Sequence, residues 1–198
     1  MNLFILDTDP NIAAVYNCDI HVRKIILEAA SCMCAAHWEY GFKNLSNAPG
    51  PLQRGQYRGR THHNNHITRW VRESVKNYEW TYVHALALCD QYTLRSRHGR
   101  RHASEPIIRW LGDNIPPIEL EEQTPFRQAV APECYHSNPV VAYWVYYVAC
   151  KRHLARWTNQ VPEWFTYLTS KLLDGAKIED LLGEADSFIN NSFEVSNA

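Results

Sequence analysis

A polar or acidic residue directly precedes proline at four places in this chain, and this feature restricts the backbone more strongly than any other. The four pairs are Asp9-Pro10, Glu105-Pro106, Thr124-Pro125 and Asn138-Pro139. Asp, Thr and Asn are preferred helix caps, and proline fits the first helical turn because its missing N–H has no partner there. The pairs predict short helices over 10–17, 104–111 and 124–130, and a longer one over 140–157.

Apolar residues recur at spacings of three and four, which is typical of a helix with one buried face. Residues 19–40 form such a helix, which Gly41 ends. Its apolar stripe comprises Val22, Ile25, Ile26, Ala29, Ala30 and Met33. The same spacing predicts one long helix over 67–94 and further helices over 163–173 and 176–190.

These patterns predict a mostly α protein: a single-domain irregular helical bundle over residues 1–198, with at most a minor N-terminal strand. Residues 3–6 are either that strand or an extended plug. Residues 43–66 lack apolar periodicity and are rich in Arg and His, which predicts a long functional loop. Residues 176–198 are predicted to be an acidic C-terminal helix and tail.

The chain has no run of eighteen apolar residues and no positively charged stretch at its start. We therefore expect a cytoplasmic protein without a membrane partner. In that compartment the six cysteines are expected to be reduced thiols.

Positive charge is concentrated in the middle of the chain, although the formal net charge is −1. Residues 54–109 contain eleven Lys and Arg residues, ten of them Arg, against four acids. Residues 160–198 contain two Lys and seven acids. Arginine forms forked hydrogen bonds to phosphate. The middle of the chain therefore predicts a phosphate-bearing partner, and a merely solvated surface is the alternative.

His62, His63 and His66 place three imidazoles within five residues. A metal site, a phosphate contact and a plain polar loop are all compatible with this spacing. The HExxH, GxGxxG, P-loop and GxSxG motifs are absent from the sequence. No metal or other cofactor is therefore predicted.

The segment NCDIHVRK, residues 17–24, contains the strongest catalytic candidates. A carboxylate beside an imidazole suits general acid–base catalysis, so we predict catalytic roles for Asp19, His21 and the nearby Asp7. In the alternative interpretation Asp19 is an N-cap, His21 is a polar first-turn residue and Lys24 lies in solvent.

Two further groups complete the predicted site. The substrate or DNA contacts are Lys24, Arg58, Arg60, His63, Arg72, Glu73, Asn77, Arg97, Arg100 and His102. The predicted base-stacking residues are Trp38, Tyr78 and Trp80, because aromatic rings provide platforms for bases.

Six short segments together resemble a family of small, largely uncharacterised phage and bacterial proteins. They are LDTDP (6–10), CDIHVRK (18–24), WVRESVKNY (70–78), RHGRRH (97–102), TPFRQA (124–129) and PEWF (162–165). The family is similar to DNA-glycosylase-like proteins that act on modified pyrimidines in phage DNA. Its pattern has lysine where this chain has Ile20 and Arg100.

The resemblance implies an enzyme that excises a hypermodified pyrimidine from double-stranded DNA in phage defence. In such a hydrolysis Asp19 would stabilise the sugar cation, His21 would orient water or protonate the base, and Asp7 would be a second acid. Two alternatives remain open. One is a hydrolase or transferase acting on a small phosphorylated nucleotide or metabolite, and the other is a non-enzymatic phage inhibitor.

Overall fold

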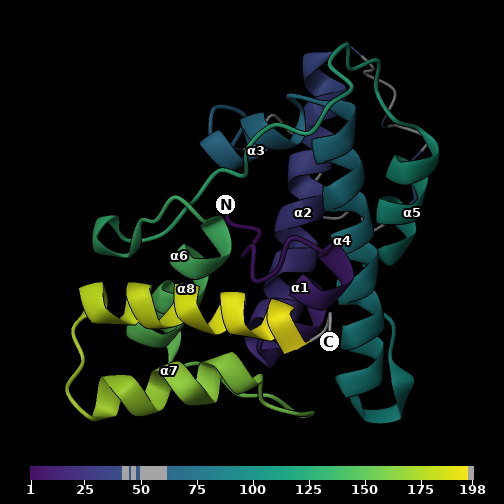
Figure 1. Cartoon of the computed structure of the whole chain (residues 1–198). Helices are drawn as coiled ribbons and strands as arrows, with labels where there is room; N and C mark the ends of the chain where they lie inside the picture. Colours follow the sequence, from purple (N-terminus) through teal and green to yellow (C-terminus); the bar gives the residue numbers. More distant parts are fainter. Residues whose placement is uncertain (42–44, 46–47, 50–61, 196–198) are drawn as a thin grey trace.

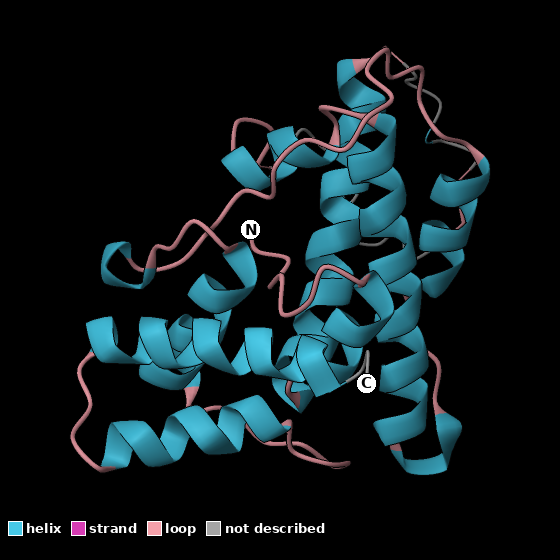
Figure 2. Ribbon diagram, in the orientation of Figure 1, coloured by secondary structure: helices cyan, strands magenta, loops and turns pink. Residues whose placement is uncertain are grey.

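The computed structural model describes residues 1–41, 45, 48–49 and 62–195. The chain is 63% helical, and its described residues form eight α-helices and no strand (Figure 2). The predicted mostly α, single-domain fold is confirmed.

Two groups of helices lie on either side of the N-terminal segment (Figure 1). In the first group the long helices α2 and α4 run side by side, and three short helices pack on them. The bounds of this group are α1 Pro10–Tyr16, α2 Asp19–Glu39, α3 His66–Val71, α4 Val75–Arg95 and α5 Glu105–Asp113.

The second group is formed by the C-terminal part of the chain. Helix α6 packs on α8, and α7 packs on both. The bounds are α6 Pro139–Tyr146, α7 Glu163–Leu173 and α8 Ile178–Val195, and a π-helical turn over Tyr147–Lys151 continues α6.

The N-terminal residues 3–6 form a buried plug in the core, one of the two predicted alternatives. Their side chains are between 0% and 4% exposed. The plug is not extended throughout, because Phe4 has φ 46° and the Leu6 N–H donates to the Phe4 carbonyl (2.8 Å). The predicted apolar stripe of α2, from Val22 to Met33, is also buried. The core therefore combines the N-terminal segment with the facing helices.

The prediction of a single helix over 67–94 is wrong, because the helix is interrupted between α3 and α4. Ser74 has an extended backbone, with φ −146° and ψ 160°, and its hydroxyl accepts a hydrogen bond from the Asn77 N–H (3.1 Å). A serine that caps the following helix cannot also continue the preceding one.

The helix predicted over 124–130 is also absent, and this segment has no regular secondary structure. Its backbone groups bond to distant side chains. The Thr124 N–H donates to the Asn77 side chain (3.0 Å), and the Ala129 N–H donates to the Tyr143 hydroxyl (3.0 Å). Tertiary hydrogen bonds satisfy groups that a helix would otherwise pair internally.

The helix predicted over 140–157 ends early, at Lys151. The segment after it lies against the turn between α1 and α2. The Arg156 carbonyl accepts from the Asp19 N–H (2.8 Å), and the Trp157 indole N–H donates to the Tyr16 carbonyl (3.1 Å).

All six cysteines have free thiols. In the part of the chain that the structure describes, no helix combines the length and apolarity needed to cross a membrane.

Candidate active site

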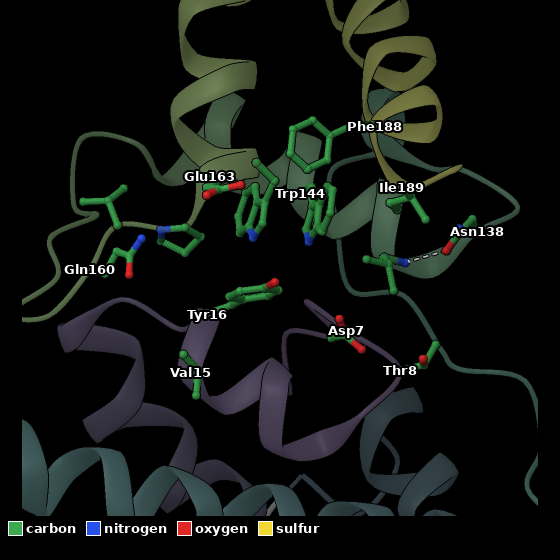
Figure 3. Close-up of a pocket in the computed structure, with 14 residues that line it drawn as sticks. Asp7, Thr8, Val15, Tyr16, Asn138, Trp144, Gln160, Glu163, Phe188 and Ile189 are labelled. Atoms are coloured by element: carbon green, nitrogen blue, oxygen red, sulfur yellow. Dashed lines mark hydrogen bonds between the residues drawn. The ribbon is translucent and has the colours of Figure 1, made fainter. Parts of the chain in front are cut away.

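A pocket of about 670 Å³ lies between the N-terminal segment, α1 and the C-terminal helices (Figure 3). This volume is typical of a small-molecule site. We call it the aromatic pocket. Its rings are Tyr16, Trp144, Trp164 and Phe188, and its polar side chains include Asp7, Asn138, Gln160 and Glu163.

Asp7 is held through the backbone on both of its sides. The Trp144 indole N–H donates to the Leu6 carbonyl (2.8 Å), and the Trp80 indole N–H donates to the Thr8 carbonyl (2.7 Å). These bonds fix the Leu6–Asp7 peptide unit on one side of Asp7 and the Thr8–Asp9 unit on the other. Its carboxyl group is thereby preorganised at the pocket wall.

His84 holds the same segment at two further carbonyls. Its Nδ1 lies 2.9 Å from the Pro10 carbonyl and its Nε2 lies 3.1 Å from the Leu3 carbonyl. Complete burial lowers the pKa of His84 to about 4, although the two carbonyls oppose this shift. At neutral pH the uncharged ring donates to one carbonyl, since a neutral imidazole has only one N–H.

The environment of the aromatic pocket raises the pKa of two oxygen groups, those of Asp7 and Tyr16. Burial raises the pKa of the Asp7 carboxyl, the negative charge of Asp9 adds to the increase, and hydrogen bonds from backbone N–H groups oppose it. Burial also raises the pKa of the Tyr16 phenol, with further contributions from Asp7 and Glu163. In Figure 3 the Tyr16 ring lies between Glu163 and Asp7.

Parallel indoles form one wall of the pocket. The rings of Trp144 and Trp164 stack with centroids 4.9 Å apart and an angle of 4° between their planes. Tyr16 meets Trp164 edge-on at 6.1 Å, and Phe188 meets Trp144 edge-on at 5.9 Å. The two indoles are 5% and 1% exposed, so they support the half-buried rings of Tyr16 and Phe188, which are the faces that a flat, weakly polar ring can reach.

Asp19 lies outside the aromatic pocket, and its side chain contacts neighbouring protein groups. It is the first residue of α2, whereas Cys18 occupies the N-cap position, so the predicted capping role is wrong. Its carboxylate accepts from Arg95 (3.2 Å) and from the Thr158 hydroxyl (2.9 Å). These contacts join the start of α2 to the end of α4.

His21 is buried, with 5% of its surface exposed. Its Nδ1 lies 2.5 Å from the Tyr147 hydroxyl and 3.4 Å from the Cys18 sulfur, and its ring stacks on Phe4 at 4.4 Å. Burial lowers its pKa to about 4, and the nearby lysine charges add to the decrease. The sequence predicted that Asp7, Asp19 and His21 act together in catalysis. The structure does not bring these three side chains into one site.

The predicted binding residues fall into separate surfaces. Lys24 is exposed and lies 3.6 Å from Glu28. Arg97 and Arg100 are exposed beside the end of α4, and the His102 ring packs edge-on against Tyr92.

A second, polar pocket of about 610 Å³ contains Arg72 and Glu73, together with Glu39, Tyr40, His66, Arg69, Trp70 and Arg127. Arg72 donates to the His63 carbonyl (2.6 Å). The His63 ring lies 2.8 Å from the Glu39 carboxylate. His63 and Arg72 are thus engaged with neighbouring protein groups.

Arg58 and Arg60 lie outside the described residues. Within the described ranges, no three His, Cys, Asp or Glu side chains are grouped so that they could hold a metal ion.

Asn77 is completely buried and supports the fold. Its amide donates to the Trp70 carbonyl (2.8 Å) and to the Thr124 hydroxyl (2.7 Å). That hydroxyl in turn lies 3.3 Å from Glu73. Glu73 and Asn77, which were predicted as substrate or DNA contacts, therefore both contact Thr124 at the start of the segment that follows.

The three predicted stacking residues do not line the aromatic pocket. Tyr78 is fully buried and its hydroxyl donates to the Leu111 carbonyl (3.0 Å). Trp80 is 6% exposed, and its indole N–H donates to the carbonyl of Thr8, a residue of the pocket lining. Trp38, which is half-buried, packs against the core. Tyr78 and Trp80 offer no free face to a base.

The aromatic pocket instead uses residues that the sequence analysis did not select. They are Tyr16, Trp144, Glu163 and Trp164. The available signal was the segment PEWF, which combines an acid with two aromatic rings beside a helix start.

The six segments on which the predicted resemblance was based meet in pairs. Segments 6–10 and 162–165 both line the aromatic pocket. Segments 70–78 and 124–129 are joined through Asn77. Segments 18–24 and 97–102 lie at one end of the molecule, where the charge of Arg23 affects His102.

Comparisons of this chain with protein-family models, curated proteins and solved structures each gave no match.

Proposed function

We propose that this protein hydrolyses the N-glycosidic bond of a nucleobase in the aromatic pocket. One observation carries the proposal: the Asp7 carboxyl, whose pKa is raised by burial, shares an aromatic pocket with a second carboxyl group, that of Glu163. Glycoside hydrolysis uses two carboxyl groups, one of them protonated at working pH.

The roles follow from the two environments. Asp7, with its raised pKa, is the general acid that protonates the departing base. Glu163 is the exposed carboxylate that takes a proton from the attacking water. Water oxygen bonds to C1′ of the sugar as the C1′–N bond breaks. The products are the free base and a sugar with a hydroxyl at C1′.

The lining favours a base over a phosphate as the occupant. It contains Asp7 and Glu163 but no Lys or Arg among the described residues. A phosphate group would meet two carboxyl groups without a compensating cation. A planar base can pack against the half-buried rings of Tyr16 and Phe188. It can also exchange hydrogen bonds with the Asn138 and Gln160 side chains. The resemblance to DNA-glycosylase-like proteins favours a modified pyrimidine.

The experiment is a base-release assay on duplex DNA and on free nucleosides, each with normal or modified pyrimidines. Released base is measured by chromatography, and abasic sites in DNA are measured by alkaline cleavage. Asp7→Asn should lower the rate about 10² to 10⁴-fold, the usual range for loss of a general acid.

Two matched variants make the result specific. Asp9→Asn removes the same charge two residues away and keeps an N-cap, since Asn and Asp cap equally well. Because the Asp9 charge contributes to the raised pKa of Asp7, this variant should lose some activity but retain most of it. Asp19→Asn tests the residue that the sequence favoured, and it should also retain activity. Unchanged turnover in Asp7→Asn, or loss confined to Asp19→Asn, would contradict the proposal.

A further inference from the structure

Exposed arginines gather where the start of α2 meets the end of α4. A groove of about 290 Å³ lies there, and its lining includes Arg23, Tyr92 and Ser96. The Ser96 hydroxyl donates to the Arg100 carbonyl (3.2 Å), which places the turn after α4 beside the groove. We call Arg23, Arg97 and Arg100 the arginine end.

The positive charges of the arginine end are not compensated. Among the described residues, none of its three arginines forms an ion pair or a side-chain hydrogen bond. The two nearby carboxylates already have partners. Asp19 pairs with Arg95, and Glu105 pairs with both Arg101 and Arg109.

Arg95 does not add to the free charge, because protein acceptors use its guanidinium. It donates to the carbonyls of Val15 (2.8 Å) and Asn17 (2.7 Å), to the Gln91 side chain and to Asp19. Arg95 therefore serves to hold neighbouring parts of the chain together. The other three arginines retain forked donors that match phosphate oxygens.

The groove lies next to the aromatic pocket, because two separate segments of the chain each contribute residues to the lining of both. Tyr16 lines the pocket and Asp19 lines the groove, three residues later. Likewise Thr158 lines the groove and Gln160 lines the pocket. Three residues span at most about 10 Å, so one nucleotide can reach both.

We propose that the arginine end binds the phosphate backbone of DNA, so that a nucleotide flipped from the duplex places its base in the aromatic pocket. The location of the base rests on the proposed function, whereas backbone binding stands on the arginines alone. Enzymes that act on a base in DNA need such an anchor, because they hold the flanking phosphates while the base leaves the stack.

Binding is tested with a labelled DNA duplex and the Asp7→Asn protein, which keeps the substrate intact. Its affinity is measured over a series of salt concentrations. The triple variant Arg23→Gln/Arg97→Gln/Arg100→Gln is compared in the same background. Each lost phosphate contact lowers the slope of log affinity against log salt by about 0.9, so the expected change is about 2.7.

The control variant Arg69→Gln/Lys76→Gln/Arg127→Gln removes the same charge from the region of the polar pocket. It should keep a slope close to the parent value. An equal loss in both triple variants would overturn the inference, because general charge would then explain binding. Binding of a polyglutamate peptide at least as tight as that of DNA would also overturn it and would indicate an acidic protein partner.

The two proposals fail separately. Base release from free nucleosides, with DNA affinity unaffected by the arginine variants, supports the aromatic pocket and overturns the arginine end. Arginine-dependent DNA binding without base release from any substrate supports the arginine end and overturns the proposed function.

Discussion

The aromatic pocket and the arginine end are adjacent, but they are built in opposite ways. Asp7 is fixed by indoles that come from residues 80 and 144, far along the chain. The arginine end comes mainly from one turn after α4, and its three side chains are exposed and unpaired within the described structure. The pocket is preorganised for one geometry, whereas the arginines can adjust to a partner.

This difference matches what each region has to do in the proposed reaction. Acid–base chemistry needs a carboxyl group held in one position, and burial there tunes its pKa. Backbone phosphates tolerate looser contacts, because their attraction depends on charge more than on angle. Changes in the pocket framework should therefore affect stability and activity together, and changes at the arginine end should affect binding alone.

The largest expected effect is acid destabilisation of the buried framework. His21, His37 and His84 each have a pKa of about 4 in the folded chain, against an ordinary value of 6.5, because burial disfavours the charged ring. The unfolded chain therefore binds more protons between these values. Stability should be complete above pH 6.5 and should fall toward pH 4, by up to about 1.4 kcal/mol per pH unit for each histidine.

Urea unfolding at a series of pH values measures this dependence. His84→Gln removes one titrating group near Asp7 and should give a shallower fall than the parent protein. Stability that is flat between pH 6.5 and 4, or a slope unchanged by the variant, would show that the pocket framework does not depend on these neutral rings.

Arg95→Gln should give the next largest effect, because this side chain joins the two regions. Its loss removes a donor from the Val15 and Asn17 carbonyls and leaves the Asp19 carboxylate without its cation, with the Thr158 hydroxyl still donating to it. Breaking a buried ion pair costs about 3 to 5 kcal/mol. We expect about 2 to 3 kcal/mol here, since Asp19 is one-third exposed. Urea unfolding at pH 7.5 measures the change, and a loss below 1 kcal/mol would show that the regions are not coupled through Arg95.

Trp144→Phe tests whether the Leu6 carbonyl must be held for Asp7 to act. The variant keeps a ring but removes the indole N–H, which should cost about 1 to 3 kcal/mol of stability. We also expect a lower kcat, since Asp7 is next to the freed carbonyl. Trp80→Phe is the companion variant on the other side. Full activity in both variants would mean that Asp7 does not depend on these bonds.

Arg97→Gln should have the smallest effect on folding. The side chain is exposed and has no ion pair in the described structure, and such surface changes usually stay within 0.5 kcal/mol. Thermal unfolding of the variant should match that of the parent while its DNA affinity falls. A clear loss of stability would mean that the arginine end supports the fold and is not reserved for a partner.

Local patterns determined much of this protein from the sequence alone. The apolar stripe of α2, the cap at Asp9 and the start of α7 after Pro162 all predicted helices that the structure contains. Helical geometry also held the signal that separates Asp19 from His21. Residues two positions apart in the sequence are related by a rotation of about 200° around a helix, so the side chains of Asp19 and His21 point to nearly opposite faces.

Only the tertiary structure decided where backbone groups bond to distant side chains. Asn77 and Tyr143 bond to the backbone of residues 124–130, which form no helix despite their local helix signal. Trp80 and Trp144 place Asp7 at the pocket. Spacing rules describe the neighbours of a residue along the chain. They do not specify which carbonyl a remote indole will reach, because packing of the whole core sets that contact. The sequence by itself therefore determined most of the helices and the charge, and the tertiary structure decided which residues line the candidate site.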